Sequence, residues 1–522
     1  MVKVNFLKIT GGEIGMLKIG WSRRDVSTDK PVCIMGLFYV RVSKGVLDPI
    51  TLTALTIADE NDYVIFVSCD LVDVRAGVLD EVRRRVAAAA PEIDTSKILM
   101  NATHTHSGPI VQIGESVGWW GNLDGFPHDG TDITPPGEYS EFFIENAVSA
   151  VIESFRSRSE GSISYGYGYA AVAHSRRSVY SEDLSKDEEY VKNSLYVHGH
   201  ARMYGNTDDE RFRHYEAGTD HFANFLYTFD KVGNLTGAIV NIPCPSQLCA
   251  HEWMLSADFW HDTRCEIRKN HGDIFILTQC AAAGDLSPTI LHYKKAQSRR
   301  YKLKFSDYKI DERVEFDIEA MNTRRDIAIR ISDAFNEVYS WASKEKLSDF
   351  ELVHSVKTIE LDKRLITDEE YSAAVAARDE QNKQELAFIT DDDPREVLKH
   401  NSRLCASRNR YNDVISRYEK QKTEPKHSME LHVIKMGELA FASNQFELYM
   451  DYQHRIQARS PFTQTFVVQL CAQPSQKSGT YLATERGVWG VGYSASMFCN
   501  IVSPEGGQQL VDETVKELKR LY

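Results

Sequence analysis

The chain has 522 residues, of which 61 are lysine or arginine and 75 are aspartate or glutamate, so its formal charge is −14. Apolar residues make up 42% and charged residues 26%, the proportions of a globular protein with a sizeable core, which excludes extensive disorder. The acidic balance argues against a protein that binds nucleic acid or anionic membranes, because both functions need clustered basic residues.

The cysteines and the N-terminal residues point to one compartment. Nine cysteines, an odd number without a C-x-x-C pair, form neither a disulfide framework nor a zinc finger, and they fit a reducing cytoplasm. Residues 1–17 lack the apolar segment of a signal peptide, and no stretch approaches the 18 apolar residues of a membrane-spanning helix. We therefore expect a cytoplasmic protein without a transmembrane helix.

Strands and helices alternate in the first half of the chain. A β-branched and aromatic run predicts a strand over 63–68, helical spacing predicts a helix over 79–90, and another strand begins at 97–100. This βαβ unit indicates an α/β fold whose sheets are mixed but mostly parallel and covered by helices. Residues 225–229 and 236–242 flank a turn and predict a hairpin.

The second half has a different composition. Residues 294–426 are charged and largely helical, which predicts a helical insertion or layer within a single catalytic domain spanning 1–522. A last helix is expected at 507–521. Further strands are predicted over 273–278, 439–442 and 466–470, and helices of the insertion over 318–344, 368–385 and 395–420.

Polar residues follow several of the predicted strands, where ligands bind in open α/β sheets. In the loop 101–109, His104 and His106 are two residues apart, so both rings project to one side of an extended backbone. Two imidazoles on one side suit a metal ion, or one ligand with an acid/base partner. Two half-exposed loop histidines are the alternative.

The second loop carries a cysteine. Cys244 stands between two prolines after the strand 236–242, and His251 and His261 follow it. A thiolate is a good zinc ligand, but an unpaired cysteine is more often a small buried core residue.

The third loop, 281–288, places Asp285 and Ser287 two residues apart. The pair is able to orient a water or bind a substrate hydroxyl, and a turn closed by Pro288 is the structural alternative. Ser287 lacks the G-x-S-x-G elbow of a nucleophilic serine.

Two later strand ends carry single candidates. Glu447 follows the strand 439–442 and either completes a metal site or stabilises the first turn of the next helix. Tyr481 follows the strand 466–470 and is either an anion-stabilising hydroxyl or a half-buried tyrosine. Trp119 and Trp120 are either a platform for a sugar or acyl group or large core residues.

Taken in order, these loops resemble the neutral (alkaline, non-lysosomal) ceramidase family over nearly the whole chain, as its catalytic domain. The segment 102–109 (ATHTHSGP) is the most specific match, and 284–288 (GDLSP) is similar to the family's GDVSP. The segments 19–27, 442–447 and 481–484 fall, in order, where the family has its other motifs.

The resemblance implies one zinc ion held by two histidines, a glutamate and a tyrosine. Carried over, His104, Glu447 and Tyr481 are three of these ligands. The family's second histidine falls on Cys244, so Cys244, His251 or His261 fills that position.

The resemblance also implies the residues around the zinc ion. His106 is the acid/base or hydrogen-bonding neighbour of the metal. Ser287, with Asp285 beside it, falls on the serine proposed as nucleophile. Arg176 or Arg177 falls on a substrate-contacting arginine.

The function expected from this resemblance is a zinc-dependent hydrolase in which metal-activated water attacks an amide or related acyl bond. We expect a soluble small-molecule or glycan-derived substrate, no nucleic-acid partner, no stable membrane insertion, and a possible homo-oligomer. A zinc-dependent enzyme that cleaves a sugar linkage is one alternative. A non-catalytic binding protein on the same fold is another.

Overall fold

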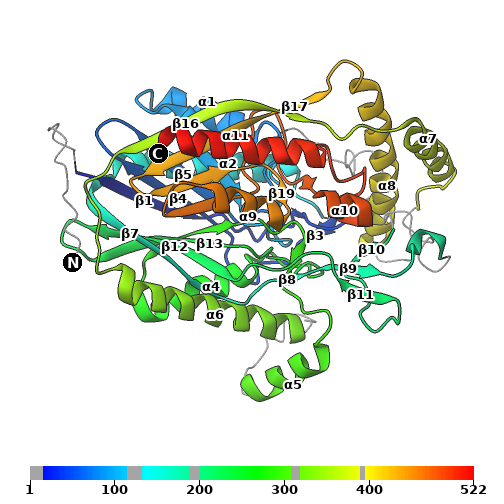
Figure 1. Cartoon of the computed structure of the whole chain (residues 1–522), viewed down its shortest axis with the longest axis horizontal. Helices are drawn as coiled ribbons and strands as arrows, with labels where there is room; N and C mark the ends of the chain where they lie inside the picture. Colours follow the sequence, from blue (N-terminus) through cyan, green and yellow to red (C-terminus); the bar gives the residue numbers. More distant parts are fainter. Residues whose placement is uncertain (1–15, 114–131, 188–198, 307–317, 388–393) are drawn as a thin grey trace.

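The computed structural model describes residues 16–113, 132–187, 199–306, 318–387 and 394–522. Two stacked sheets form its centre, with helices outside them (Figure 1). The larger sheet has the strand order β14–β13–β12–β7–β1–β4–β5–β6. Its strands are β1 (Lys18–Asp25), β4 (Thr51–Ala58), β5 (Tyr63–Cys69), β6 (Ile98–Ala102), β7 (Ser159–Tyr169), β12 (Phe222–Asp230), β13 (Leu235–Ile242) and β14 (Phe275–Cys280).

The predicted mixed α/β class is confirmed, but the expectation of mostly parallel sheets is wrong. In the larger sheet only β5–β6 and β13–β14 are parallel pairs. The other neighbours pair antiparallel. The reason is the length of the connections. The turns after β4 and β12 are too short for a crossover, so each returns the chain as a hairpin. The βαβ unit of β5, α1 (Val78–Ala89) and β6 is present as predicted.

The smaller sheet packs against the larger one. Its strands lie in the order β16 (Leu352–Asp362), β17 (Lys426–Met436), β18 (Leu439–Ser443) and β20 (Gln464–Val468). Phe66 of β5 meets Phe441 of β18 with ring centroids 5.0 Å apart, within a buried cluster shared by both sheets. This apolar layer holds the two sheets face to face.

Helices cover the outer faces of both sheets. The larger sheet is covered by α1, α2 (Pro136–Arg156), α4 (Phe259–His271) and α6 (Ile318–Ala342). The smaller sheet is covered by α11 (Pro504–Leu521), beside α9 (Met450–Arg459). Buried residues of α2 recur every three or four positions, as in Phe143, Ala147, Ala150 and Val151, so one face of the helix packs on the sheet.

The charged range 294–426 is not wholly helical. It holds α5 (Lys294–Lys304), α6, α7 (Asp368–Asn382) and α8 (Pro394–Lys420), but also β16, which pairs along its length with β17. Figure 1 shows α7 and α8 together at one end of the molecule and α5 below the sheets. Tyr371 of α7 stacks on Tyr418 of α8 at 4.3 Å.

Short elements complete the fold at the strand ends. The short strands pair with one another outside the two large sheets. Several of these short elements carry residues of the site described below. They are β2 (Cys33–Ile34), β3 (Arg41–Val42), β8 (His174–Ser175), β9 (Arg177–Tyr180), β10 (Ala201–Met203), β11 (Phe212–Tyr215), β15 (Leu286–Ser287), β19 (Glu447–Leu448), β21 (Tyr481–Leu482) and α10 (Glu485–Gly490).

Within the described ranges, no helix combines the length and the apolar character that crossing a bilayer requires.

Glu430 on β17 makes the fold sensitive to acid. Burial alone would raise the pKa of Glu430, but hydrogen bonds from His432 and Arg83 outweigh burial and lower this pKa to about 2. A carboxyl whose pKa is lower in the folded than in the unfolded chain stabilises the fold above its unfolded pKa and loses that contribution as the pH falls. We expect about 2–3 kcal/mol of unfolding free energy to be lost between pH 4.5 and pH 2 through this group.

The measurement is urea unfolding of the wild type and Glu430→Gln at pH 7 and at pH 3. The variant should be less stable at pH 7, and the gap between the two proteins should narrow at pH 3. A gap of the same size at both pH values would contradict the assignment.

Candidate active site

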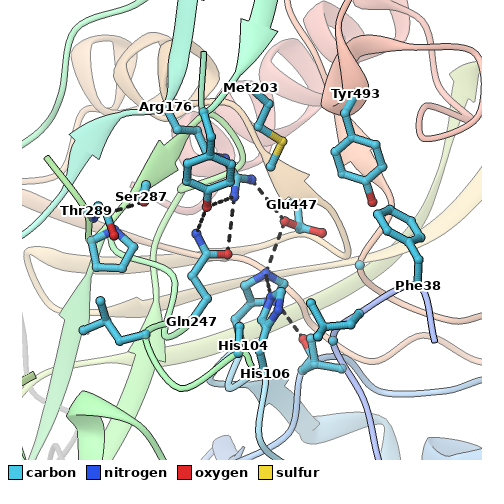
Figure 2. Close-up of a pocket in the computed structure, with 18 of the residues that line it drawn as sticks. Phe38, His104, His106, Arg176, Met203, Gln247, Ser287, Thr289, Glu447 and Tyr493 are labelled. Carbon is cyan, nitrogen blue, oxygen red and sulfur yellow. Dashed lines mark hydrogen bonds and ion pairs between the residues drawn. The ribbon is translucent and has the colours of Figure 1, made fainter. Parts of the chain in front are cut away.

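A cavity of about 650 Å³ opens where the loops after several strands meet. Figure 2 shows side chains converging on it from elements that are far apart in the sequence. Seven of the candidates from the sequence line it: His104, His106, Arg176, His251, Ser287, Glu447 and Tyr481.

The loop after β6 brings both histidines into the cavity. His104 has the left-handed backbone angle φ 67°, and its Nδ1 lies 2.9 Å from the carbonyl oxygen of Val72. A carbonyl partner fixes the proton on Nδ1 and leaves Nε2 facing the cavity, as in histidines that bind metals. Thr105 anchors the loop to the segment before α4, because its hydroxyl donates to the carbonyl of Ser256 at 2.7 Å.

The side chains of Glu447 and His106 converge on that of His104. Its Nε2 lies 3.2 Å from Oε2 of Glu447 and 3.3 Å from Nε2 of His106 (Figure 2). Burial alone would lower the pKa of His104, but the carboxylate of Glu447 outweighs burial and raises it. Burial, followed by the charges of His104 and Arg41, lowers the pKa of His106 well below its usual value. His106 is therefore neutral near pH 7.

Backbone pairing places Glu447 beside Tyr481. The two residues are partners in the parallel pair β19–β21, and the backbone N–H of Glu447 donates to the carbonyl of Thr480 at 2.9 Å. This short ladder fixes the carboxylate and the phenol hydroxyl on one wall of the cavity.

Arg176 connects the two walls of the cavity. Its Nη2 donates to the hydroxyl of Tyr481 at 3.1 Å and to the carbonyl of Gly284 at 2.8 Å, and it lies 3.7 Å from Oε2 of Glu447. The side chain is 1% exposed, so these contacts hold a desolvated cation in one place. The pKa of Arg176 is raised well above its usual value, because Tyr481 and other neighbours outweigh burial.

The structure distinguishes Arg176 from Arg177, which the sequence left open. Arg177 does not line the cavity. It forms a buried ion pair with Glu216 at 2.6 Å and donates to the carbonyl of Val491.

Asp285 and Ser287 have different surroundings. The carboxylate of Asp285 is buried outside the cavity lining and accepts the backbone N–H of Met450 at 3.0 Å. Burial raises its pKa to about 7. Ser287 lines the cavity, and its hydroxyl accepts the backbone N–H of Thr289 at 3.1 Å. Asp285 therefore supports the loop, and Ser287 faces the ligand space.

Cys244 lies in the core rather than in the cavity lining. Its thiol lies 3.4 Å from the carbonyl oxygen of Val172, and burial raises its pKa well above the usual value. Of the two alternative histidines, His251 lines the cavity. His261 lies on α4, where its Nε2 is 3.5 Å from the sulfur of Cys265.

Two residues near Arg176 were not predicted from the sequence. The hydroxyl of Tyr204 and Oε1 of Gln247 accept from Nη1 of Arg176 at 3.3 and 3.4 Å, and both residues line the cavity. Figure 2 shows Gln247 beside Arg176. Gln247 stands three residues after Cys244, in the same loop from which the sequence analysis selected Cys244. Nothing in the sequence around Tyr204 indicates its role.

The donor set fits a zinc ion in its chemistry. Across the described ranges, no three His, Cys, Asp or Glu side chains are arranged as a ready metal site. His104, Glu447 and Tyr481 nevertheless supply the imidazole, carboxylate and phenol that the resemblance implies. Two lone-pair atoms, His104 Nε2 and Glu447 Oε2, face each other at 3.2 Å, a spacing that requires a shared proton or a cation. It is close to the roughly 3.3 Å between ligands of a tetrahedral zinc ion.

Trp119 and Trp120, the predicted platform for a sugar or acyl group, lie outside the described residues.

Cys265 is the thiol that we expect to react first. The hydrogen bond with His261 lowers its pKa and outweighs burial, and Cys265 is exposed, whereas burial raises the pKa of Cys244. Since the thiolate is the nucleophile, iodoacetamide should label Cys265 before the other described cysteines. Peptide mass spectrometry after timed labelling measures this order. His261→Asn should slow labelling of Cys265 severalfold, and an unchanged rate would show that the histidine does not activate the thiol.

Solved structures of neutral ceramidases share this fold. Neutral ceramidase from Pseudomonas aeruginosa superposes with a TM-score of 0.61 at 16% sequence identity, covering 97% of this chain and 75% of the ceramidase chain. A structure described as ceramidase complexed with C2 gives a TM-score of 0.59 at the same identity and coverage. The fold expected from the resemblance is thus confirmed. Comparison with protein-family models gives no match, and neither does comparison with curated proteins.

Proposed function

We propose that this protein is a zinc-dependent hydrolase of the ceramidase kind that cleaves an amide or related acyl bond. The observation that carries the proposal is the convergence of His104, His106 and Glu447 at 3.2–3.3 Å in a cavity that Arg176 also lines. The fold shared with neutral ceramidases supports the same reaction class by analogy.

His104, Glu447 and Tyr481 would hold the zinc ion. Three protein ligands are typical of catalytic zinc sites, which keep a further position open. When bound, zinc polarises the scissile carbonyl and makes hydroxide available near neutral pH. Cys244 is left out of this ligand set because its sulfur faces the carbonyl of Val172.

His106 and Arg176 would act directly on the reacting groups. The neutral Nε2 of His106 would accept a proton from the attacking water and return it to the nitrogen of the leaving amine. Arg176, held by Tyr204 and Gln247, would stabilise the carbonyl oxygen with its positive charge as negative charge develops there. Ser287 would contact the substrate with its hydroxyl, and Asp285 would keep the loop in place from behind.

The first test is hydrolysis of a water-soluble N-acyl amine by the zinc-loaded protein in heavy-oxygen water. One heavy oxygen in the released carboxylate is expected. Label at an anomeric carbon of a glycoside substrate would instead support the sugar-cleaving alternative. A zinc-loaded protein that cleaves neither class of substrate would leave the non-catalytic alternative.

His106→Asn tests the proton transfer, because asparagine keeps a polar side chain but has no basic nitrogen. The variant should keep its zinc and lose about 10²- to 10⁴-fold in kcat. His214→Asn, on the exposed strand β11, is the matched control and should keep the wild-type kcat. Retained activity in His106→Asn would overturn the role given to His106.

A further inference from the structure

Arg41 on β3 is a buried cation that the proposed mechanism does not use. Its side chain is 0% exposed, and every hydrogen bond that it makes to a described residue ends on a backbone carbonyl oxygen. Burial lowers the pKa of Arg41 to about 10, so the guanidinium stays charged near pH 7. A cation that no carboxylate neutralises is costly to hold in the interior, whereas an apolar side chain of similar volume would avoid that cost.

The guanidinium of Arg41 joins segments that carry residues of the cavity wall. Its Nη2 donates to the carbonyl of Met35 at 2.7 Å and also to the carbonyl of His106, while Nη1 donates to the carbonyl of Glu252. Met35 and His106 line the cavity, and so does His251, which precedes Glu252. A single nitrogen therefore ties Met35 to His106.

The backbone around Arg41 is bound to the same histidine loop. Arg41 belongs to the antiparallel pair β2–β3. Just after β2, the N–H of Met35 donates to the carbonyl of Gly108 at 3.1 Å, and the N–H of Ile110 donates to the carbonyl of Cys33 at 2.9 Å. The β2–β3 pair and the end of the histidine loop thus form one unit, to which the guanidinium adds its own bonds.

Gly36 determines where the ring of His106 packs. The glycine has a positive φ of 114°, and a Cβ atom at this position would lie 2.7 Å from both Cβ and Cγ of His106. The imidazole therefore rests directly on the backbone of Gly36, next to the carbonyl of Met35 that Arg41 binds. The backbone N–H of His106 is also held, because it donates to the carbonyl of Ser246 at 3.1 Å.

The ring held in this way points toward the proposed catalytic groups. Nε2 of His106 lies 3.3 Å from Nε2 of His104, and Figure 2 shows both rings next to Glu447. A general base acts only within hydrogen-bond distance of the proton that it transfers. A misplacement of about 1 Å costs about 10²-fold in rate, so the position of this ring matters for the reaction.

We propose that Arg41 is a positioning residue for His106. By binding the carbonyls of Met35 and His106 with one nitrogen, it holds the imidazole against Gly36 in the direction that proton transfer requires. This inference rests on the proposed function for the role of His106. The position of the ring itself is testable without turnover.

Arg41→Met keeps a long side chain but removes its donors. The variant should keep its zinc, because the partners of His104 are Val72 and Glu447. Its kcat on a water-soluble N-acyl amine should fall about 10²-fold, while KM should change less than about threefold. Arg41→Lys should recover most of the kcat, because an ammonium group has donors for both carbonyls that Nη2 binds.

Arg83→Met is the matched control. It removes a largely buried guanidinium that binds the carbonyls of Ser96 and Ile98 and the carboxylate of Glu430, away from the cavity lining. The control should be less stable in urea but keep the wild-type kcat. An equal loss of kcat in Arg83→Met and Arg41→Met, or a wild-type kcat in Arg41→Met, would overturn the proposal.

Gly36→Ala tests the same contact and leaves the guanidinium in place, so it is informative even where Arg41→Met does not fold. The added methyl group should displace the ring of His106 and lower kcat while zinc stays bound. Crystal structures of both variants measure the displacement directly, and an unmoved ring would overturn the proposal. A wild type that hydrolyses no amide, together with a displaced ring in the variants, would refute the proposed function and leave the positioning role intact.

Discussion

Replacement of His104 by alanine is expected to remove the bound zinc and to lower kcat/KM by at least about 10³-fold. His104 supplies the nitrogen at the centre of the three converging side chains, 3.2 Å from Glu447 and 3.3 Å from His106. Zinc supplies several kcal/mol of transition-state stabilisation, and each 1.36 kcal/mol corresponds to a factor of ten in rate. Metal content by mass spectrometry and kcat/KM on one amide measure both effects.

Two further variants make this prediction specific. Glu447→Gln should lose zinc as His104→Ala does, because it removes the anionic ligand. Cys244→Ser should retain one zinc per chain, because the sulfur of Cys244 points to the carbonyl of Val172 outside the cavity lining. Loss of zinc in Cys244→Ser would restore the cysteine to the ligand set and contradict the assignment made here.

Removing the charge of Arg324 is expected to destabilise the fold by about 3–5 kcal/mol. Arg324 on α6 is 2% exposed and pairs with Asp48 at 2.9 Å and with Asp262 at 2.8 Å. Its guanidinium also donates to the hydroxyl of Ser256 at 3.1 Å. In Arg324→Met, Asp48 would remain buried without its cation, and an unpaired buried charge is costly.

Urea unfolding at pH 7 measures this effect. Arg156→Met is the control, since Arg156 forms an exposed pair with Glu92 at 2.9 Å, and its loss should cost no more than about 1 kcal/mol. Similar destabilisation by both substitutions would show that the pairs of Arg324 are as well solvated as those of Arg156.

Much of the fold was predictable because it depends on local patterns. The run 63–68 and the helical spacing of 79–90 predicted β5 and α1 within one residue at each end. Strand β16 was missed, because its burial depends on packing between two sheets and not on the charged composition around it. Strand direction was misjudged by extending one βαβ unit to sheets that hairpins dominate.

The residues of the candidate site also divide into those that the sequence predicts and those that it does not. His104 and His106 were predictable because both belong to one short loop after β6, although His104 has a left-handed φ of 67° and not the extended backbone from which the direction of the rings was predicted. The partners of Arg176 were not, because Tyr204 and Gln247 reach it from separate loops whose meeting depends on the complete fold. Cys244 shows the converse case, since its position in the sequence matched a ligand while the loop turned its sulfur into the core.

The pairing of Glu447 with Tyr481 joins β19 to β21, while His104 belongs to the first third of the chain. A ligand that bridges these residues joins His104 to two segments that lie about 340 and 380 positions further along the chain. It binds only when all three segments are in place. Occupancy of the site is therefore coupled to global unfolding: the ligand stabilises the native state by mass action, and its removal weakens distant parts of the molecule together with the cavity.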